Sequence, residues 1–186
     1  MRIAYQGAPG AYGHLAAREL YPNARPHAMS DFAAVARAVA SGKAELGILP
    51  VANSVIGAIT EAESVLRAHD SLVVVQETEY AVRHCLLGLP GATLAIIRTV
   101  ESHWAALAQC ASYLAARRFV LHPGDDTAGA ARRIASDRNF TCAAIASEEA
   151  AELYGLQVLA RDIADAPDNR TRFAVIATAA RAATVA

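Results

Sequence analysis

Apolar runs that suit β-strands alternate along this chain with alanine-rich runs that suit helices. "RIAYQG" precedes a helical pattern at residues 12–20, "ELGILP" precedes one from about Thr60, and "LAIIRTV" precedes one from Ser102. "RFVLH" and "CAAIA" precede helical patterns at 127–135 and 147–154. Because each helix carries the chain back to begin another strand, the alternation predicts an α/β fold with mostly parallel strands.

Several polar residues stand where these helices are expected to begin. Thr60 and Glu63 have the spacing of a T-x-x-E capping box, in which each side chain pairs with a backbone N–H of the first turn. The other candidate N-cap residues are Ser102, Asp126 or Thr127, and Ser147.

One segment interrupts the alternation. Residues 71–87, "SLVVVQETEYAVRHCLL", remain strand-like with no helix between, which suits a long strand or a crossing between two lobes. "TRFAVIAT", residues 171–178, is the candidate for the return crossing. Two crossings predict a two-lobed domain with a cleft between the lobes, where small ligands bind.

The domain organisation follows from these crossings. Residues 1–186 are expected to form a single domain, since the chain shows no repeat or linker. Lobe 1 would contain about 1–77 plus 170–186, and lobe 2 about 78–169. The predicted fold class is α/β and two-lobed, like a periplasmic binding protein, with mostly parallel sheets.

Composition limits the partners and the location. The chain has 17 basic and 18 acidic residues, a net charge of −1, and scattered arginines, so no nucleic-acid partner is expected. Charged residues or His interrupt every apolar stretch before it reaches the roughly 20 residues of a membrane span. No signal peptide precedes the first strand. We expect a cytoplasmic protein with no membrane partner.

The three cysteines, Cys85, Cys110 and Cys142, are far apart in apolar or helical contexts. An odd number without a paired motif favours buried reduced thiols over a disulfide or a zinc site. No metal ligand set is predicted.

Small polar residues follow the predicted strands, where ligands bind in α/β sheets. The strand in "ELGILP" is expected to stop at Pro50, and Asn53 and Ser54 follow it. The other such positions are 7–12, Ser102, Thr127 and 169–173. Hydroxyls, amides and helix N-termini suit a carboxylate ligand, whereas no paired carboxylates stand ready for acid–base chemistry. A catalytic His is not favoured.

Three interpretations stay open at the residue level. Gln109 lies two turns after Ser102, so both could face a ligand, or Ser102 could be a plain N-cap and Gln109 a solvent-facing side chain. "GAPGAYG" is a tight turn that either presents N–H groups to a carboxylate or only joins a strand to a helix. Strand alternation places Thr171 and Phe173 on one face and Arg172 on the other, without saying which face meets a ligand.

Six blocks in order resemble the catalytic domain of prephenate dehydratase over nearly the whole chain. They are "GAPGAYGHLAA", "LPVANSVIGAI", "SHWAALAQC", "TAGAA", "AAIASEEAAELYGLQVL" and "DNRTRFAVI". The resemblance implies conversion of prephenate to phenylpyruvate, with loss of carbon dioxide and water, in phenylalanine biosynthesis. It also implies no metal or organic cofactor, and a homodimer.

Carried over by position, the resemblance implies that Thr171 is the catalytic hydroxyl that assists the leaving group and that Arg172 is a carboxylate partner. Threonine is a poor free acid, so a hydrogen bond or relay is expected rather than outright proton donation. The implied substrate-binding residues are Asn53, Ser54, Ser102, Gln109, Thr127 and Phe173.

The chain departs from the family pattern at several positions. Ala52 stands where the family usually has Glu, and Trp104 and Ala105 stand where it has Pro and Gln. Ala11 and Gly13 replace hydroxyl residues of the first loop. The chain ends shortly after the last strand, so no regulatory amino-acid-binding domain, and hence no feedback inhibition through one, is expected.

Three alternative functions remain. Arogenate differs from prephenate only in carrying an amino group in place of the keto group, so an arogenate dehydratase is possible. A non-aromatising prephenate decarboxylase is disfavoured by the presence of Thr171, although Ala52 and Trp104 keep it open. The third alternative is a carboxylate-binding module without catalysis.

Overall fold

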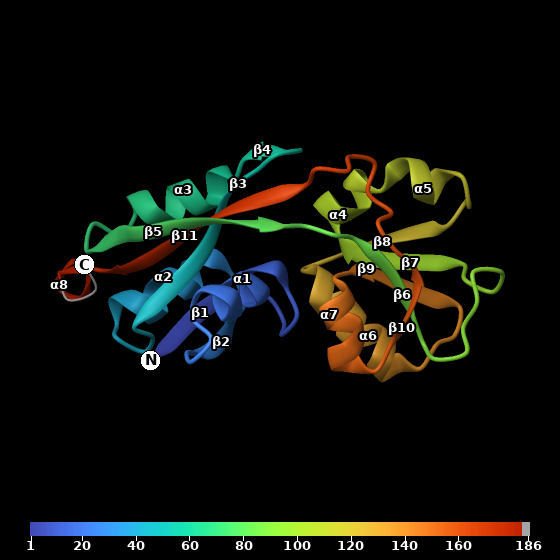
Figure 1. Cartoon of the computed structure of the whole chain (residues 1–186), viewed down its shortest axis with the longest axis horizontal. Helices are drawn as coiled ribbons and strands as arrows, with labels where there is room; N and C mark the ends of the chain where they lie inside the picture. Colours follow the sequence, from blue (N-terminus) through green and yellow to red (C-terminus); the bar gives the residue numbers. More distant parts are fainter. Residues whose placement is uncertain (184–186) are drawn as a thin grey trace. The chain divides into compact units, whose positions relative to one another are not determined.

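The computed structural model describes residues 1–183, and the chain divides into two compact units (Figure 1). The first unit contains Met1–Gly7, Tyr12–Ala81 and the chain from Arg170 onward. The second contains Ala8–Ala11 and Val82–Asn169. The first crossing therefore lies at 81/82 rather than at the expected 77/78, and the short segment 8–11 belongs to the second unit, which the sequence did not indicate.

The first unit is built on a mixed sheet with the strand order β2-β1-β3-β11-β5. Its strands are β1 (Arg2–Gln6), β2 (Arg25–Met29), β3 (Leu46–Asn53), β4 (Gly57–Ala58), β5 (Leu72–Ala81) and β11 (Arg170–Thr178). β1 pairs in parallel with β2 and β3, whereas β11 runs antiparallel between β3 and β5. The short β4 pairs antiparallel with β3.

Helices cover both faces of this sheet. They are α1 (Tyr12–Leu20), α2 (Phe32–Ala40), α3 (Thr60–Arg67) and the short α8 (Ala179–Ala182). Alternation along β1 sends Ile3 and Tyr5 to the face of α1, and Ala4 to the face of α2 and α3. At Gly47 of β3 a Cβ atom would lie 2.9 Å from Val35 of α2, so the missing side chain lets α2 approach the sheet closely.

The second unit holds a five-stranded sheet with the order β10-β6-β9-β7-β8. Its strands are β6 (Cys85–Gly88), β7 (Thr99–His103), β8 (Val120–Gly124), β9 (Cys142–Ala146) and β10 (Gln157–Ala160). β7 pairs in parallel with β8 and β9, and β6 pairs antiparallel with β9 and β10.

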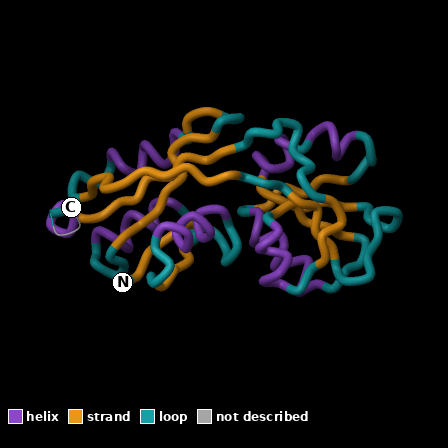
Figure 2. Tube along the Cα trace, in the orientation of Figure 1, coloured by secondary structure: helices purple, strands orange, loops and turns teal. Residues whose placement is uncertain are grey.

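Helices also cover both faces of the second sheet, and Figure 2 shows that each unit contains both strands and helices. They are α4 (Trp104–Gln109), α5 (Ala111–Ala115), α6 (Thr127–Asp137) and α7 (Glu148–Tyr154). Leu87 points to a core shared with α6 and α7, and the neighbouring Leu86 points to a core shared with α4 and α5. Many helix positions in these cores are alanine, which allows close helix–sheet packing.

The α/β class is confirmed, but the expectation of mostly parallel sheets is wrong. Parallel pairing holds for β2-β1-β3 and for β8-β7-β9, the strands joined by helical crossovers. Antiparallel pairing enters with β5, β6, β10 and β11. The sequence pattern shows helices between strands, but it does not show which earlier strand a returning strand will join.

The strand in "ELGILP" does not stop at Pro50, because β3 continues to Asn53. Pro50 has no N–H to give to a ladder, and it lies at a bulge. Arg172 of β11 pairs with Ala52 and Phe173 pairs with Pro50, so Val51 is the extra residue on β3. A bulge is a position where a sheet tolerates proline.

Two of the predicted helix starts are confirmed. Asp126 is the N-cap of α6 and accepts a hydrogen bond from Gly129 N at 2.6 Å. Ser147 is the N-cap of α7 and accepts one from Ala150 N at 3.1 Å. Both residues offer a side-chain oxygen to the free N–H groups of the first turn.

The other two predicted N-caps are wrong. α3 begins at Thr60, as expected, but Ile59 is its N-cap and no side chain makes a capping bond, so the predicted capping box of Thr60 and Glu63 does not form. Ser102 lies inside β7, and His103 is the N-cap of α4, where its Nδ1 accepts from Ala105 N at 3.3 Å. Strand pairing with β8 and β9 extends β7 past the point where local sequence favoured a helix.

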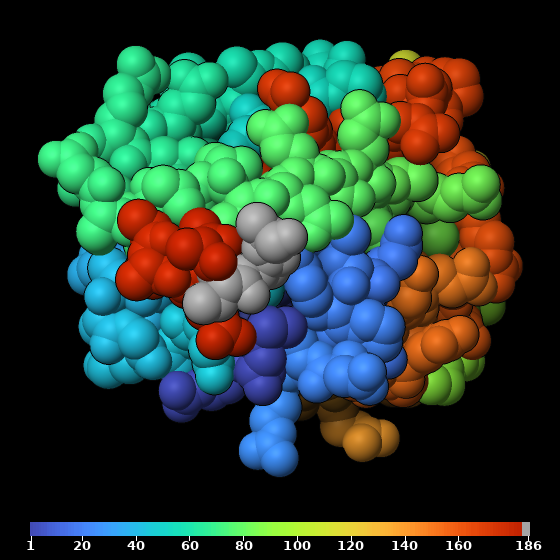
Figure 3. All heavy atoms as spheres, turned by 60° about the vertical axis from the view of Figure 1, so that its left-hand side comes forward, coloured from blue at the N-terminus to red at the C-terminus, as the bar shows by residue number. Residues whose placement is uncertain are grey.

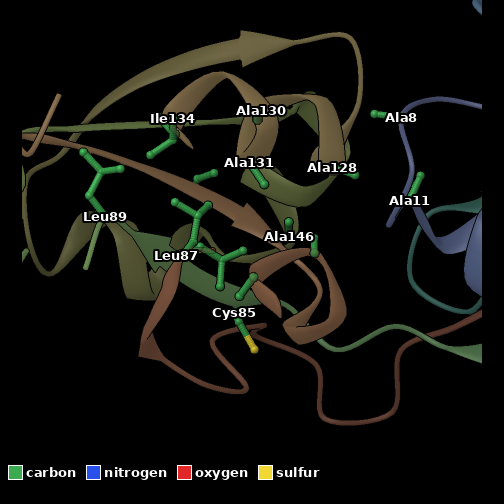
Figure 4. Close-up of a cluster of buried hydrophobic side chains, with 14 residues drawn as sticks. Ala8, Ala11, Cys85, Leu87, Leu89, Ala128, Ala130, Ala131, Ile134 and Ala146 are labelled. Carbon is green, nitrogen blue, oxygen red and sulfur yellow. The ribbon is translucent and has the colours of Figure 1, made fainter. Parts of the chain in front are cut away.

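Hydrogen bonds and apolar contacts fasten the loop of residues 8–11 within the second unit. The three bonds run from Ala8 N to Asp126 Oδ1 at 3.3 Å, from Ser147 Oγ to Gly10 O at 3.1 Å, and from Tyr154 Oη to Pro9 O at 2.7 Å. Ala8 and Ala11 belong to the apolar cluster that includes Ala128 and Ala146 (Figure 4). The glycine-rich turn therefore has a structural role, and one of its N–H groups binds Asp126.

The outer strand of the first sheet lies at the surface. β5 is the last strand in the order, and the chain from 72 to 81 crosses Figure 3 as a green band. Gln76, Glu77 and Glu79 are exposed along it. Charged side chains on an edge strand oppose pairing with other chains. Within residues 1–183, every helix is too short or too polar to cross a membrane.

Ser147→Ala is expected to lower the free energy of unfolding by about 2–3 kcal/mol, because it removes an N-cap and leaves the buried Gly10 carbonyl without this donor. Asp31→Ala is the matched control. Asp31 caps α2 through Ala34 N at 2.6 Å in an exposed setting, so its loss should cost only about 1 kcal/mol. Urea unfolding measures both, and equal losses would contradict the role of Ser147 in holding the loop.

Candidate functional site

The register of β3 and β11 brings two predicted site residues together in the first unit. Thr171 lies opposite Asn53 across the antiparallel pair, and each residue is 8% exposed. Asn53 Nδ2 donates to Thr171 Oγ1 at 3.0 Å and to the Arg170 carbonyl oxygen at 3.0 Å. The threonine oxygen thus accepts a hydrogen bond from the amide.

The other end of the Asn53 amide is held by the turn after β3. Its Oδ1 accepts from Val55 N at 2.9 Å and from Ile56 N at 3.1 Å. Two backbone donors on Oδ1 mean that the NH₂ group must face Thr171 and cannot exchange places with the oxygen. Because Thr171 Oγ1 accepts from Asn53, its own proton points away from the Asn53 NH₂ group. The sequence predicted Asn53 at the site but not this internal role.

Ser54 lies next to this pair and is exposed. Its Oγ accepts from Arg170 N at 2.9 Å, and its backbone N donates to Arg170 O at 2.9 Å. Ser54 therefore ties the turn after β3 to the start of β11. These bonds fix the backbone position of the residue that precedes Thr171.

The expected alternation along β11 is confirmed. Thr171 and Phe173 are buried, whereas Arg172 is exposed. The Arg172 guanidinium lies 3.4 Å from Glu77 Oε2 of β5, on the face opposite Thr171. Phe173 is 2% exposed and belongs to the core with Tyr5. The structure thus gives Phe173 a packing role and Arg172 an ion pair.

A second group of polar residues lies inside the second unit. Gln109, at the end of α4, is 8% exposed, so the alternative that it faces solvent is wrong. Its Oε1 pairs with His84 Nε2 at 2.8 Å and with Asn169 Nδ2 at 3.0 Å. His84 and Asn169 are themselves buried, 2% and 4% exposed.

Burial sets the protonation of His84. It lowers the pKa of the imidazole because the charged form loses its hydration, and the Gln109 contact offsets only part of that effect. His84 is therefore neutral at neutral pH and carries one ring proton. The partner of Nε2 is an amide oxygen, so that proton is on Nε2 and is donated to Gln109.

Ser102 and Thr127 lie at one edge of the second sheet. β7 and β8 are parallel neighbours, so the end of β7 and the start of α6 after β8 lie at the same edge. Ser102 is fully buried, and its Oγ donates to the Ile145 carbonyl oxygen at 2.6 Å. Thr127 is the first residue of α6 and is 9% exposed. The hydroxyl proton of Ser102 is thus used inside the sheet, whereas Thr127 lies at a helix N-terminus.

Trp104 follows this edge as the first residue of α4. It is 59% exposed, and its ring centroid is 5.5 Å from that of His103. A large exposed aromatic side chain next to Ser102 offers an apolar contact to a ligand ring. Trp104 is also the only tryptophan of the chain, so its fluorescence reports on this edge alone.

Cys85 and Cys110 are not activated nucleophiles. Burial raises the pKa of Cys110 to about 12, and it also raises the pKa of Cys85. Cys142 is only partly buried, which corrects the expectation that all three are buried. Among the described residues, no group of three or more His, Cys, Asp and Glu side chains is placed to hold a metal ion.

His84 and Asn169 are the site residues that sequence reasoning missed. His84 is one of the histidines for which the sequence does not favour a catalytic role. Asn169 lies in the strand-end segment 169–173, and no motif distinguishes it from its neighbours. The sequence gives little indication of either residue, because each is identified only by its contact with Gln109, which is distant from both in sequence.

Asn53→Asp is expected to lower the free energy of unfolding by about 1–3 kcal/mol, because a carboxylate oxygen would face the Arg170 carbonyl and Thr171 would lose its donor. Asn139→Asp is the matched control. Asn139 uses only its Oδ1, which accepts from Thr141 N at 3.0 Å and from Thr141 Oγ1 at 2.8 Å. Its replacement should therefore change stability by less than about 0.5 kcal/mol. Equal stability of the two variants in urea unfolding would contradict the assigned orientation of Asn53.

Comparison with known proteins gives the chain a family. A family model described as prephenate dehydratase matches residues 3–181. A chloroplastic arogenate dehydratase/prephenate dehydratase 2 from Arabidopsis thaliana is 42% identical over 177 residues, which is 95% of this chain and 46% of that protein. Arogenate dehydratase 1 from Petunia hybrida is 43% identical over 183 residues, covering 95% of this chain and 42% of that protein. The chain thus spans less than half the length of these relatives.

Solved structures with a similar fold include a prephenate dehydratase. GqqA, described as a novel type of quorum quenching acylase, has a TM-score of 0.85 at 38% identity, covering 96% of this chain and 64% of that chain. Prephenate dehydratase from Arthrobacter aurescens in complex with L-Phe has a TM-score of 0.88 at 26% identity, covering 96% and 60%.

A similar fold is also found in a protein of another kind. A nutrient binding protein from Burkholderia cenocepacia bound to methionine has a TM-score of 0.54 at 12% identity, covering 98% of this chain and 86% of that chain, and this likeness concerns the fold alone. The expected two-lobed α/β fold is confirmed. From the family match over 3–181 and the identity to its curated relatives, the chain belongs to the prephenate dehydratase family.

Proposed function

We propose that this chain is a dehydratase that converts prephenate, or its amino counterpart arogenate, to an aromatic product with loss of carbon dioxide and water. The observation that carries the proposal is the buried Thr171 hydroxyl, whose oxygen accepts a hydrogen bond from Asn53 at 3.0 Å. It lies within the "TRF" motif of a chain that belongs to the prephenate dehydratase family.

The reaction needs help mainly at the departing hydroxyl. As the ring carboxylate leaves as carbon dioxide, the electron pair of the broken C–C bond enters the ring, and the C–O bond to the hydroxyl breaks. The oxygen must gain a proton to leave as water. Thr171 directs its O–H away from Asn53 and can donate it to that oxygen, while the Asn53 amide stabilises negative charge that develops on Oγ1. This hydrogen bond makes threonine a better donor than its free pKa allows.

The other substrate-binding residues in this proposal are those that the family resemblance implies, and the ones in the second unit are neutral. Thr127 is the first residue of the 11-residue helix α6 and offers a neutral hydroxyl, while the carboxylate of the N-cap Asp126 already takes the Gly129 N–H. Gln109 stays a proposed substrate contact on the strength of the family resemblance. Ser102 would act by holding β7 to β9 through Ile145, since its proton is used there. Neutral donors bind a carboxylate while still letting it lose its charge as carbon dioxide.

Arg172 receives a supporting role in this proposal. Its guanidinium pairs with Glu77 on the exposed face of β11, so it stabilises the pairing of β11 with β5. The resemblance implied a carboxylate partner instead. Exposed ion pairs contribute little, about 0–1 kcal/mol, so the two roles predict different kinetic results.

A second candidate function comes from the likeness to GqqA, a quorum quenching acylase. An acylase of the hydroxyl type needs a base that removes the proton from its nucleophile. The Thr171 oxygen instead receives a hydrogen bond from an amide NH₂, which cannot accept a proton. This contact favours a hydroxyl that donates a proton over one that attacks an acyl group.

The product of the reaction separates the candidate functions. The purified chain would be mixed separately with prephenate, with arogenate and with an acylated quorum-sensing signal, and products identified by NMR. Phenylpyruvate or phenylalanine indicates the dehydratase and shows which substrate is preferred. A dihydroaromatic acid indicates the decarboxylase. Quenching of Trp104 fluorescence without turnover indicates a binding module. Homodimer formation and a cytoplasmic location stay predictions.

Thr171→Val is expected to lower kcat for the dehydration by roughly 100-fold or more, because valine keeps the shape but has no proton to donate. Thr171→Ser keeps the hydroxyl and should retain much more of the activity. Stopped assays of phenylpyruvate formation, alongside urea unfolding, measure both variants. Near-wild-type turnover of Thr171→Val would overturn the assignment.

Arg172→Ala is expected to lower kcat/KM less than about 10-fold, because the side chain lies on the face opposite Thr171 and its ion pair is exposed. Glu77→Ala removes the same ion pair from the other side and serves as the matched control. If Arg172 contacts a substrate carboxylate, Arg172→Ala will lose 100-fold or more while Glu77→Ala stays near wild type.

A further inference from the structure

The outer strand of the second sheet, β8, exposes apolar side chains. It is the last strand in the order β10-β6-β9-β7-β8, so one of its two edges has no neighbouring strand in that sheet. Val120 is 59% exposed and Leu121 is 43% exposed, and the strand contains no Lys, Arg, Asp or Glu. An apolar, uncharged edge of this kind is a template for pairing with another chain.

The other outer strands of the two sheets carry features that oppose such pairing. β2 presents Arg25 and Pro26, and β5 presents Glu77 and Glu79. The pairing of β10 with β6 shifts register between Val158 and Ala160, which distorts that strand. Charges, proline and bulges are the usual means of blocking an edge. β8 differs from these three strands because only Pro123, near its end, is of this kind.

The hydrogen bonds of β8 show which backbone groups face outward. Val120 N donates to Arg98 O at 2.9 Å, so Val120 is turned toward β7. In a parallel pair alternate residues bond to the same neighbour, so Leu121 and Pro123 direct their backbone groups away from β7. Proline has no N–H. Within β8, Leu121 is therefore the residue that can offer both an N–H and a C=O to a further strand.

The charges on either side of β8 have opposite signs. Arg117 and Arg118 precede the strand, and Asp125 and Asp126 follow it. Arg117 lies over the Tyr113 ring, 3.7 Å from its centroid, and Asp126 is the N-cap of α6. Arg118 and Asp125 are both exposed. The segment thus has a basic end, an apolar middle and an acidic end.

This pattern is complementary to itself in one direction only. Two such segments lying antiparallel place the basic end of each beside the acidic end of the other, whereas a parallel arrangement would place like charges together. We propose that the open edge of β8 pairs antiparallel with β8 of a second copy of this chain, about a two-fold axis at Leu121. Each Leu121 N–H then donates to the Leu121 carbonyl oxygen of the other copy, and the interface is the same on both sides.

The size of the strand limits the strength of the pairing. β8 has 5 residues. Two strands of this length form an interface below the roughly 1,200 Å² that stable complexes bury. We therefore expect a dimer that dissociates on dilution, with a Kd on the order of micromolar or weaker. The inference concerns a surface of the second unit and does not rest on the proposed dehydratase function.

A cross-link tests the two-fold axis. Leu121→Cys would place two thiols opposite each other, on Cα atoms about 5.5 Å apart, which is within the range of a disulfide. Val74→Cys is the matched control, because Val74 is 46% exposed on the other edge strand β5. Under mild oxidation we expect a covalent dimer from Leu121→Cys, and little from Val74→Cys or from the wild-type chain with its own three cysteines. Equal dimer from both variants would overturn the proposal.

Exchanged charges test the direction of pairing. Sedimentation velocity over a wide range of concentration should give a Kd for Arg118→Glu and for Asp125→Arg that is about 10-fold or more above wild type, because like charges now meet at both ends. An equimolar mixture of the two variants should associate like the wild type, since each arginine then meets a carboxylate. Arg67→Glu, exposed on α3, makes the same change of net charge and should leave the Kd unchanged.

Two results of this experiment would overturn the proposal. The first is a wild-type chain that stays monomeric at every concentration. The second is a mixture of Arg118→Glu and Asp125→Arg that associates no better than either variant alone. Matching urea unfolding curves of all the variants would show that the differences arise from association and not from loss of the fold. Turnover of prephenate is not measured here, so its absence would count against the proposed function alone.

Discussion

The antiparallel pairing of β11 with β3 determines what meets at the end of the first sheet. It sets Thr171 opposite Asn53, while the turn after β3 holds the Asn53 oxygen and leaves its NH₂ group to the threonine. The bulge at Pro50 lets this register exist, because it takes up one extra residue on β3 where proline could not pair. The direction of the Thr171 hydroxyl is thus set by the register of β11 on β3 and by the amide of Asn53.

Each unit contains a buried side-chain amide whose oxygen accepts two hydrogen bonds, although the donors differ. In each, a buried amide has its oxygen held by two donors, the backbone N–H groups of Val55 and Ile56 for Asn53, and two side chains for Gln109. Holding the oxygen decides where the NH₂ group goes, without any charged residue. Neutral, pre-oriented donors suit the proposed reaction, in which a carboxylate leaves as carbon dioxide, since a strong cation would stabilise the charge that has to be lost.

Much of the fold could be read from the sequence, because helix and strand periods are local. The helix at 12–20 and the strand "CAAIA" fall where the pattern placed them. The order of the strands in the sheets could not be read from the sequence. The position of β11 between β3 and β5 depends on pairing between segments that are far apart in the chain. The site shows the same limit. Asn53 and Ser102 were expected after their strands but lie within β3 and β7, and the contact of His84 with Gln109 is visible only in the structure.

The central place of β11 also bears on how the chain folds as it is synthesised. β3 and β5 leave the ribosome long before β11, yet β11 lies between them, so the first sheet remains split until residues 170–178 are made. The sheet of the second unit, formed by strands within 85–160, can assemble earlier and already has residues 8–11 available to fasten. The first unit is therefore the first to be synthesised but the last to be completed. The unpaired edges of β3 and β5 are exposed until β11 is made. Unpaired strand edges of this kind favour aggregation until the sheet is complete.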